Sequence, residues 1–216
     1  RPDGLSVPNH KPATPLPPKD FNEDIPTCNG WWNHEYEERY NPGAWQEYLK
    51  DRKPYVEDKT YFVKEMLASL GQRGQWNYTL GIGPKLDGTM PEEFRPMFEN
   101  MHRFMGWAGE AIYNTTGGEG SLIRPGWWNW WHNGKGKTFG SVTRSLCDEA
   151  LYYLHVTTAP EDVTLQLQTN GAVPSSITDL RTGKRVSFGI KGRLIIHNDD
   201  WNDVGDYGAK IFQVKF

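Results

Sequence analysis

The sequence has little of several features that would place it in a large class of proteins. Its 216 residues include only two cysteines, Cys28 and Cys147, which form neither a disulfide framework nor a metal-binding motif. No apolar run approaches the ~20 residues that a membrane-spanning helix needs. A net charge of −3 gives no electrostatic reason to expect nucleic acid or an anionic membrane as a partner. We therefore expect two free thiols, no metal ion and no other cofactor.

Proline, rather than a regular pattern, dominates the N-terminal part of the chain. Seven prolines lie within residues 1–26, and no helical or alternating periodicity runs through them. Such a stretch predicts an extended loop. Residues 1–20 are polar and do not resemble a signal peptide, and Arg1 is not an initiator methionine. We therefore expect a mature, processed or partial chain.

The segment from residue 56 to residue 114 predicts a helix, a strand and a second helix. Asp58 caps the first helix, residues 56–71. Its apolar face consists of Phe62, Val63, Met66, Leu67 and Leu70. Residues 76–82 form a buried strand, and Asp87-Gly88 a turn. Thr89 is predicted to cap the second helix, and Pro96 suggests that its first turn is separate. The apolar stripe of this helix consists of Phe94, Met97, Met101, Phe104, Met105 and Ala108.

The pattern changes after residue 114. Residues 115–120 form a predicted Gly/Thr linker, and seven short alternating runs follow residue 138. These runs are residues 139–144, 151–156, 163–167, 176–180, 185–188, 193–197 and 209–215. Short strands with turns about every ten residues are typical of an antiparallel β-sandwich. The fold class is therefore α/β followed by all-β, with one domain at residues 1–117 and a second at 118–216.

Three blocks of sequence carry a resemblance to a known family. They read Asn-Tyr-Thr-Leu-Gly-Ile-Gly-Pro at residues 77–84, Asp-Gly-Thr-Met-Pro-Glu at 87–92 and Gly-Glu-Ala-Ile-Tyr-Asn-Thr at 109–115. In this order and spacing the chain resembles the C-terminal half of the retaining α-L-fucosidases of glycoside hydrolase family 29. The resemblance implies the C-terminal part of a (β/α) TIM-like barrel followed by an antiparallel β-sandwich. Gly81 departs from the family, which usually has Asn there.

The resemblance also implies a reaction that needs two carboxyl groups, a nucleophile and an acid/base. No segment here resembles the strand that bears the family's nucleophilic Asp, so we expect that residue in a preceding segment or companion chain. Glu23 is the candidate acid/base and Asp24 the alternative, since residues 20–26 resemble the loop that carries this acid in some members. An ordinary solvated loop acid is the competing interpretation of both.

Further residues are candidates for substrate binding. Residues 28–35 take the place of the family's Ser-Trp-Gly-Tyr loop, which implies that Trp31 or Trp32 lies against the apolar face of fucose. His34 stands beside them, and Arg1 corresponds to an arginine that donates hydrogen bonds to sugar hydroxyls. The alternatives are a solvated His34 and a mobile terminus at Arg1. Residues 127–131, rich in tryptophan, are expected at the seam between the two domains.

Two N-glycosylation sequons occur in the sequence. Asn114-Thr-Thr is expected on an exposed connection and fits a secreted or lysosomal glycoprotein. Asn77-Tyr-Thr lies in the predicted strand, where we expect no glycan.

The preferred hypothesis is an exo-α-L-fucosidase acting on fucosylated glycans, completed by the companion segment. A catalytically silent, sugar-binding relative is the alternative, and a free-standing carbohydrate-binding module is a third hypothesis. The third is disfavoured because barrel elements could not bury both faces alone. The sequence leaves the oligomeric state open, a homo-oligomer included.

Overall fold

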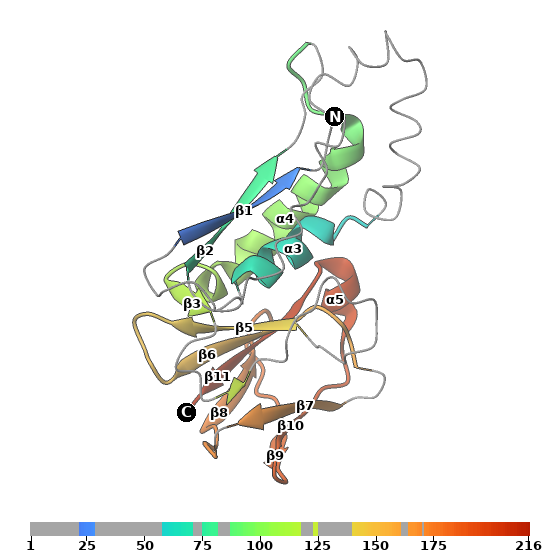
Figure 1. Cartoon of the computed structure of the whole chain (residues 1–216). Coiled ribbons are helices and arrows are strands. Elements are labelled where there is room, and N and C mark those ends of the chain that lie inside the picture. Colours follow the sequence, from blue (N-terminus) through green and yellow to red (C-terminus); the bar gives the residue numbers. More distant parts are fainter. Residues whose placement is uncertain are drawn as a thin grey trace.

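The computed structural model describes residues 22–28, 58–70, 75–81, 87–117, 123–124, 140–160, 164–169 and 171–216. These residues form four layers (Figure 1). A pair of parallel strands lies on helices α3 and α4, the helices lie on a five-stranded sheet, and a four-stranded sheet lies beyond it. No helix in these segments is both long and apolar enough to cross a lipid bilayer.

The first layer consists of β1 (Asn22–Cys28) and β2 (Gln75–Gly81), which run parallel. The strand predicted at residues 76–82 is thus confirmed to within one residue. The loop predicted over residues 1–26 is wrong for the last five of them, which belong to β1. Pro26 has no backbone N–H, so it cannot donate a hydrogen bond to a neighbouring strand. The many prolines before it hid this strand from pattern analysis.

Helix α3 (Tyr61–Leu70) connects the two strands in sequence. Asp58 acts at its start as predicted, because its Oδ1 accepts hydrogen bonds from the backbone N–H of Thr60 at 2.9 Å and from the Thr60 hydroxyl at 2.5 Å. The Lys64 ammonium group donates to the other carboxylate oxygen at 2.9 Å. The predicted apolar face is confirmed, because four of its five members are buried and Leu70 is partly buried.

Helix α4 (Arg95–Ala108) begins later than the sequence pattern suggested. A separate 3₁₀ turn, η1 (Glu92–Phe94), precedes it and places Pro96 in the first turn of α4, where its missing N–H costs no helical bond. The predicted cap at Thr89 is wrong. The backbone N–H of Thr89 instead donates to Asp87 Oδ1 at 2.9 Å and its hydroxyl at 2.6 Å, which closes a turn around Asp87.

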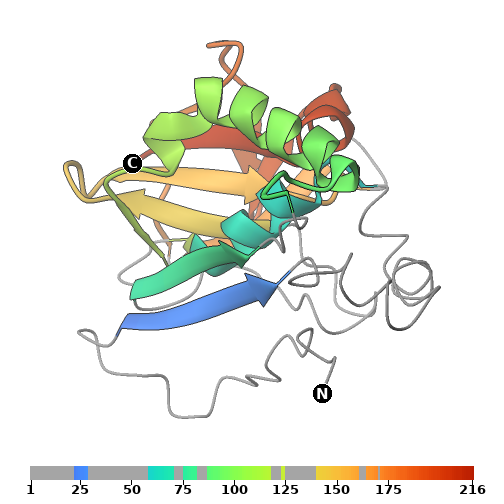
Figure 2. The same cartoon turned by 90° about the horizontal axis from the view of Figure 1, so that it is seen from above.

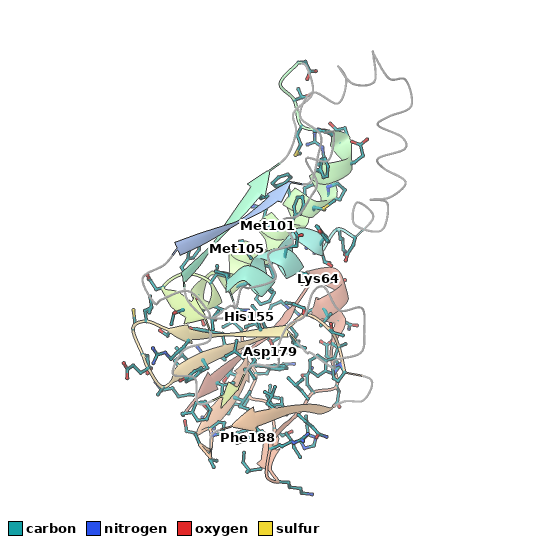
Figure 3. All side chains as sticks on the ribbon, in the orientation of Figure 1. Lys64, Met101, Met105, His155, Asp179 and Phe188 are labelled. Atoms are coloured by element: carbon teal, nitrogen blue, oxygen red, sulfur yellow. The ribbon has the colours of Figure 1, made fainter. Side chains whose placement is uncertain are left out.

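The two helices have apolar contacts on both sides. Toward β2, Phe62, Phe94 and Met97 form one buried cluster, against which Leu80 packs. Toward the five-stranded sheet, Val63, Leu67, Phe104 and Ala108 pack with Tyr153, Ala209 and Ile211. Figure 3 labels Met101 and Met105 on α4, both partly buried as predicted for its stripe. The helices therefore contact both the parallel strands and the five-stranded sheet through apolar side chains.

The five-stranded sheet has the order β3-β5-β6-β11-β8. Its strands are β3 (Thr115–Gly117), β5 (Gly140–Ser145), β6 (Leu151–Val156), β11 (Lys210–Lys215) and β8 (Ser176–Asp179). All pairs in it are antiparallel. The linker predicted at residues 115–120 is wrong in its first half, because β3 pairs with β5. A three-residue turn separates the 3₁₀ turn η2 (Gly109–Ala111) from β3, so the chain enters this sheet at residue 115.

The four-stranded sheet has the order β4-β7-β10-β9. Its strands are β4 (Ile123–Arg124), β7 (Thr164–Thr169), β10 (Leu194–His197) and β9 (Phe188–Ile190). The strand predicted at residues 185–188 is displaced, since β9 begins at Phe188 and Arg185 makes only an isolated bridge to Thr178. The two sheets enclose a core that includes Leu154, Leu165, Ile196 and Phe212. This is the predicted β-sandwich. A short helix, α5 (Asn202–Asp206), was not foreseen.

Candidate functional site

The parallel strands bring two chain segments to one edge of their sheet. Cys28 and Gly81, the last residues of β1 and β2, are partners in the ladder, and Figure 2 shows both arrows pointing the same way. The chain therefore leaves β1 and β2 at the same edge of this sheet. Active sites of barrel enzymes lie at the C-terminal ends of the parallel strands. This edge is the candidate site.

The two predicted acids lie on β1, toward its other end. Glu23 pairs with Trp76 and Asp24 with Asn77. Glu23 precedes Cys28 by five residues, and a strand rises about 3.3 Å per residue, so the two Cα atoms are about 16 Å apart. The expected loop around these acids is replaced by a strand. The acid/base role of Glu23 or Asp24 stays a prediction.

The predicted substrate-binding residues Arg1, Trp31, Trp32 and His34 lie outside the described residues.

The turn after β2 has the structural role that the sequence predicted. Asp87 holds Thr89 through the two hydrogen bonds described above, and both residues are exposed. Gly88 has φ of +81°, a conformation that favours glycine. The turn thus redirects the chain from β2 toward η1 and α4.

A second group of ionisable side chains lies inside the sandwich. Lys210 is 1% exposed, and its ammonium nitrogen lies 2.7 Å from Asp179 Oδ2 and 3.2 Å from Asp203 Oδ2. Arg181 Nε completes the cluster at 2.8 Å from Asp203 Oδ1. Nothing in the sequence pattern indicated this cluster, since its members come from β8, α5, β11 and a loop. Figure 3 labels Asp179 within the sandwich.

The electrostatics of this cluster indicate a structural role. Burial by itself raises the pKa of Asp179, but hydrogen bonding to Lys210 and the charge of that lysine outweigh burial, so the pKa is lowered overall. Hydrogen bonding to Asp203 raises the pKa of Arg181. Both shifts favour the charged forms of Asp179 and Arg181, as expected for ion pairs with a structural role.

His155 is a further buried ionisable group, located where β6 faces the helices (Figure 3). The Thr143 hydroxyl lies 3.1 Å from the carbonyl oxygen of Ala111 and 2.9 Å from His155 Nε2. Since the hydroxyl has one proton, which it donates to Ala111, it accepts a hydrogen bond from Nε2–H. His155 Nδ1 has no partner among the described residues. Burial lowers the pKa of His155 to about 3. The imidazole is therefore a neutral part of the core.

We expect this histidine to make the fold sensitive to acid. Its pKa is about 3 when folded and 6.5 in the ordinary case, so the unfolded chain binds the proton first. The stabilisation is complete above pH 6.5 and is lost as the pH falls toward 3, by at most about 1.4 kcal/mol per pH unit. Urea titrations between pH 7 and 4 should show a shallower pH slope for His155→Leu. Thr143→Val, which keeps the imidazole, should retain the slope; equal slopes for both variants would contradict the assignment.

Within the described residues, no three His, Cys, Asp or Glu side chains lie together in a way that could hold a metal ion. Cys147 has a free, exposed thiol.

Sequence comparison gives no relative. A scan against protein-family models finds no match, and a search of curated proteins also finds none.

Comparison with solved structures gives a consistent set. An α-L-fucosidase of glycoside hydrolase family 29 from Bacteroides thetaiotaomicron matches 73% of this chain and 31% of its own, with a TM-score of 0.56 and 18% identity. α-L-Fucosidase isoenzyme 1 from Paenibacillus thiaminolyticus matches 73% of this chain and 34% of its own, with a TM-score of 0.55 and 14% identity. The Thermotoga maritima α-fucosidase in complex with fucose matches 74% and 34%, with a TM-score of 0.51 and 19% identity.

The chain thus spans about a third of the length of the fucosidases that it matches. The identities are low, so the likeness concerns the fold. That likeness confirms the resemblance predicted from the sequence: the fold of this chain is that of a part of the family 29 α-L-fucosidases, and its extent is consistent with their C-terminal portion.

Proposed function

We propose that this chain is the C-terminal part of a retaining exo-α-L-fucosidase that removes terminal α-L-fucose from glycans. The observation that carries the proposal is the fold likeness over 73% of the chain to several fucosidases. One of these, from Bacteroides thetaiotaomicron, is described as a trapped covalent intermediate with 2-fluoro-fucosyl fluoride. A covalent intermediate is the feature that distinguishes a retaining glycosidase.

The parallel unit supports a barrel as the setting. β1, α3 and β2 form a strand, a helix and a parallel strand, which is the repeating unit of a (β/α) barrel. Parallel sheets occur almost only where both faces are covered, and two strands alone do not close a barrel. We therefore propose that the residues before β3 complete a barrel begun by a companion segment or chain, and that β3 and the residues after it form the attached sandwich domain. This moves the expected boundary from residues 117/118 to residues 114/115, because β3 pairs with β5.

The proposed mechanism divides the two carboxyl groups between the segments. The companion segment supplies the aspartate that attacks C1 of fucose, and this chain supplies the acid/base. Glu23 and its alternative Asp24 lie near the N-terminal end of β1, away from the candidate edge, and Glu35, which follows that edge in sequence, competes with them for this role. The acid/base protonates the glycosidic oxygen as the bond to the aglycone breaks. The same residue then removes a proton from the water that releases fucose. The two carboxyl groups must be about 5–5.5 Å apart for this reaction.

The candidate edge provides the sugar-binding part of the proposal. Trp31 or Trp32, which follow β1 in sequence, places an aromatic ring against the apolar face of fucose, which includes its methyl group. His34 and Arg1 donate hydrogen bonds to the sugar hydroxyls.

The test is hydrolysis of para-nitrophenyl α-L-fucoside by the native protein, companion segment included. We expect turnover by the wild type and a loss of about 100-fold or more for Glu23→Gln. Asp24→Asn and Glu35→Gln belong in the series, because Glu35 follows the C-terminal end of β1 in sequence. Glu149→Gln, an exposed residue of the β5–β6 connection, is the matched control and should retain full activity.

The outcomes separate the levels of the proposal. Unchanged turnover in Glu23→Gln with a loss in Asp24→Asn or Glu35→Gln would reassign the acid/base and keep the fucosidase. A folded native protein that binds fucose without turnover would favour a catalytically silent, sugar-binding relative. A protein in which neither binding nor turnover of fucosides is measurable would overturn the proposal.

We also propose that the protein is secreted or lysosomal, because the glycans that many such hydrolases degrade lie outside the cytosol. Support comes from the sequon at Asn114, whose side chain is exposed. Microscopy of the full protein in its native cell checks this: a cytosolic distribution would contradict it.

A further inference from the structure

Two exposed apolar side chains flank Asn114. Tyr113 is 67% exposed and Leu146 is 62% exposed, the highest values for large hydrophobic side chains among the described residues. Tyr113 directly precedes Asn114, and the backbone N–H of Leu146 donates to the carbonyl oxygen of Asn114 at 2.8 Å. These two side chains come from backbone segments that meet at Asn114, and the described fold leaves both uncovered; together they are called the apolar platform here.

The turn that carries Asn114 is well defined. It joins η2 to β3 (Figure 1), and the Thr115 hydroxyl donates to the carbonyl oxygen of Ile112 at 2.9 Å. Asn114 has φ of +54°, the one positive value at a non-glycine residue in the described segments. The Tyr113 ring lies over Gly109, with two ring carbons 3.5 Å from where a glycine Cβ would be. One edge of the ring thus lies against Gly109, and most of the ring is exposed, next in sequence to an exposed asparagine.

We propose that Asn114 bears an N-linked glycan and that its first N-acetylglucosamine packs on the platform of Tyr113 and Leu146. The motif Asn114-Thr115-Thr116 is the acceptor that N-glycosylation requires. An aromatic ring with one open face suits the C–H face of a pyranose, and Leu146 extends the apolar contact. A glycan here would cover the most exposed apolar side chains of the described fold.

The covalent step uses a polyprenyl-diphosphate-linked oligosaccharide as donor. The Asn114 amide nitrogen forms a bond to C1 of the first sugar, and that nitrogen loses one proton. The bond between C1 and the diphosphate oxygen breaks, and its electron pair leaves with the diphosphate. In the folded chain Thr116 belongs to β3, paired with Arg144, so transfer occurs before this strand has paired.

The chain has an internal control in its second sequon. Asn77-Tyr78-Thr79 lies in the middle of β2, which is paired along its length with β1. A glycan within a strand of the first layer would interfere with that pairing, so we expect the molecules that have folded to carry no glycan on this asparagine.

The first measurement is glycan occupancy of the full protein after expression in a eukaryotic secretory host. Peptide mass spectrometry before and after peptide-N-glycosidase treatment should find the glycan on Asn114 and none on Asn77. Two variants remove the acceptor without strain: Asn114→Gly suits the positive φ, and Thr116→Val keeps a β-branched residue in β3. Both should abolish occupancy, whereas Asn77→Gln should leave it unchanged. An unmodified Asn114 would overturn the proposal.

The second measurement tests the packing. Trimming the glycan to one N-acetylglucosamine should retain a rise of about 2–4 °C in the unfolding midpoint over the unglycosylated Thr116→Val protein. The acetyl methyl signal of that sugar should be shifted upfield by the Tyr113 ring in NMR spectra. In a Tyr113→Ala, Leu146→Ala double variant, both effects should disappear while occupancy persists. A glycosylated protein with no ring shift would show that the platform serves another partner, such as the rest of the protein, and would overturn the packing.

Discussion

A Gly140→Ala variant is expected to lose most of its folded population. Gly140 begins β5, the second strand of the five-stranded sheet, where it pairs with Val156 of β6. An added Cβ would lie 1.8 Å from the carbonyl oxygen of His155 and 3.0 Å from the backbone nitrogen of Thr157. These are backbone atoms of the neighbouring strand, so no side chain can move aside. The residue also has φ of +149°, which adds strain for any side chain.

The expected cost is more than about 4 kcal/mol, which is a large part of the stability of an ordinary domain. Chemical denaturation followed by circular dichroism of the full protein measures it. Gly189→Ala is the matched control, because Gly189 also lies in a strand but has no atom within 4 Å of an added Cβ. Equal midpoints for Gly140→Ala and the wild type would show that β5 and β6 are not packed as described.

Replacing Lys210 by methionine is expected to destabilise the protein by about 3–5 kcal/mol. The substitution preserves much of the side-chain length but removes the cation that two buried carboxylates share. Asp203 would keep its ion pair with Arg181 at 2.8 Å. Asp179 would lose Lys210, its ion-pair partner within the described residues. An uncompensated buried charge is the reason for the large effect.

The pH dependence gives this prediction a second readout. With Lys210 present the pKa of Asp179 is lowered, so its stabilisation is present above the ordinary value of 3.8 and is lost as the pH falls below it. Without Lys210, burial favours the protonated acid. The difference between the wild type and Lys210→Met should therefore shrink on acidification. Lys215→Met is the control, because Lys215 pairs with Asp148 on the surface, where a salt bridge contributes about 0–1 kcal/mol. Similar losses for both variants would contradict the buried cluster.

The scaffold was largely predictable because local patterns agree with tertiary packing. The apolar stripe of α4 anticipated the burial of Phe104 and Ala108, and alternation anticipated β6 to the residue. Failures occurred where local chemistry was misleading. Prolines before residue 26 concealed β1, and a Gly/Thr-rich composition concealed β3, which is held by pairing with a strand more than twenty residues away.

The candidate site was less predictable than the scaffold. Glu23 was expected in a loop, but its backbone lies in a strand whose partner is about fifty residues further along. Periodicity reports local structure and cannot show a parallel pairing of this kind. The cluster around Lys210 depends on the meeting of four separate segments, and a lysine in an alternating strand gives no sign that it is buried. The acids of the proposed reaction are divided between this chain and its companion, so one chain cannot reveal both.

The central claim is that this chain completes a retaining α-L-fucosidase. Proton NMR of the native protein, companion segment included, during hydrolysis of para-nitrophenyl α-L-fucoside tests it most directly. The account predicts that fucose is released and that the α anomer appears first, before mutarotation. Release of the β anomer first, or a folded complete protein that releases no fucose, would contradict it.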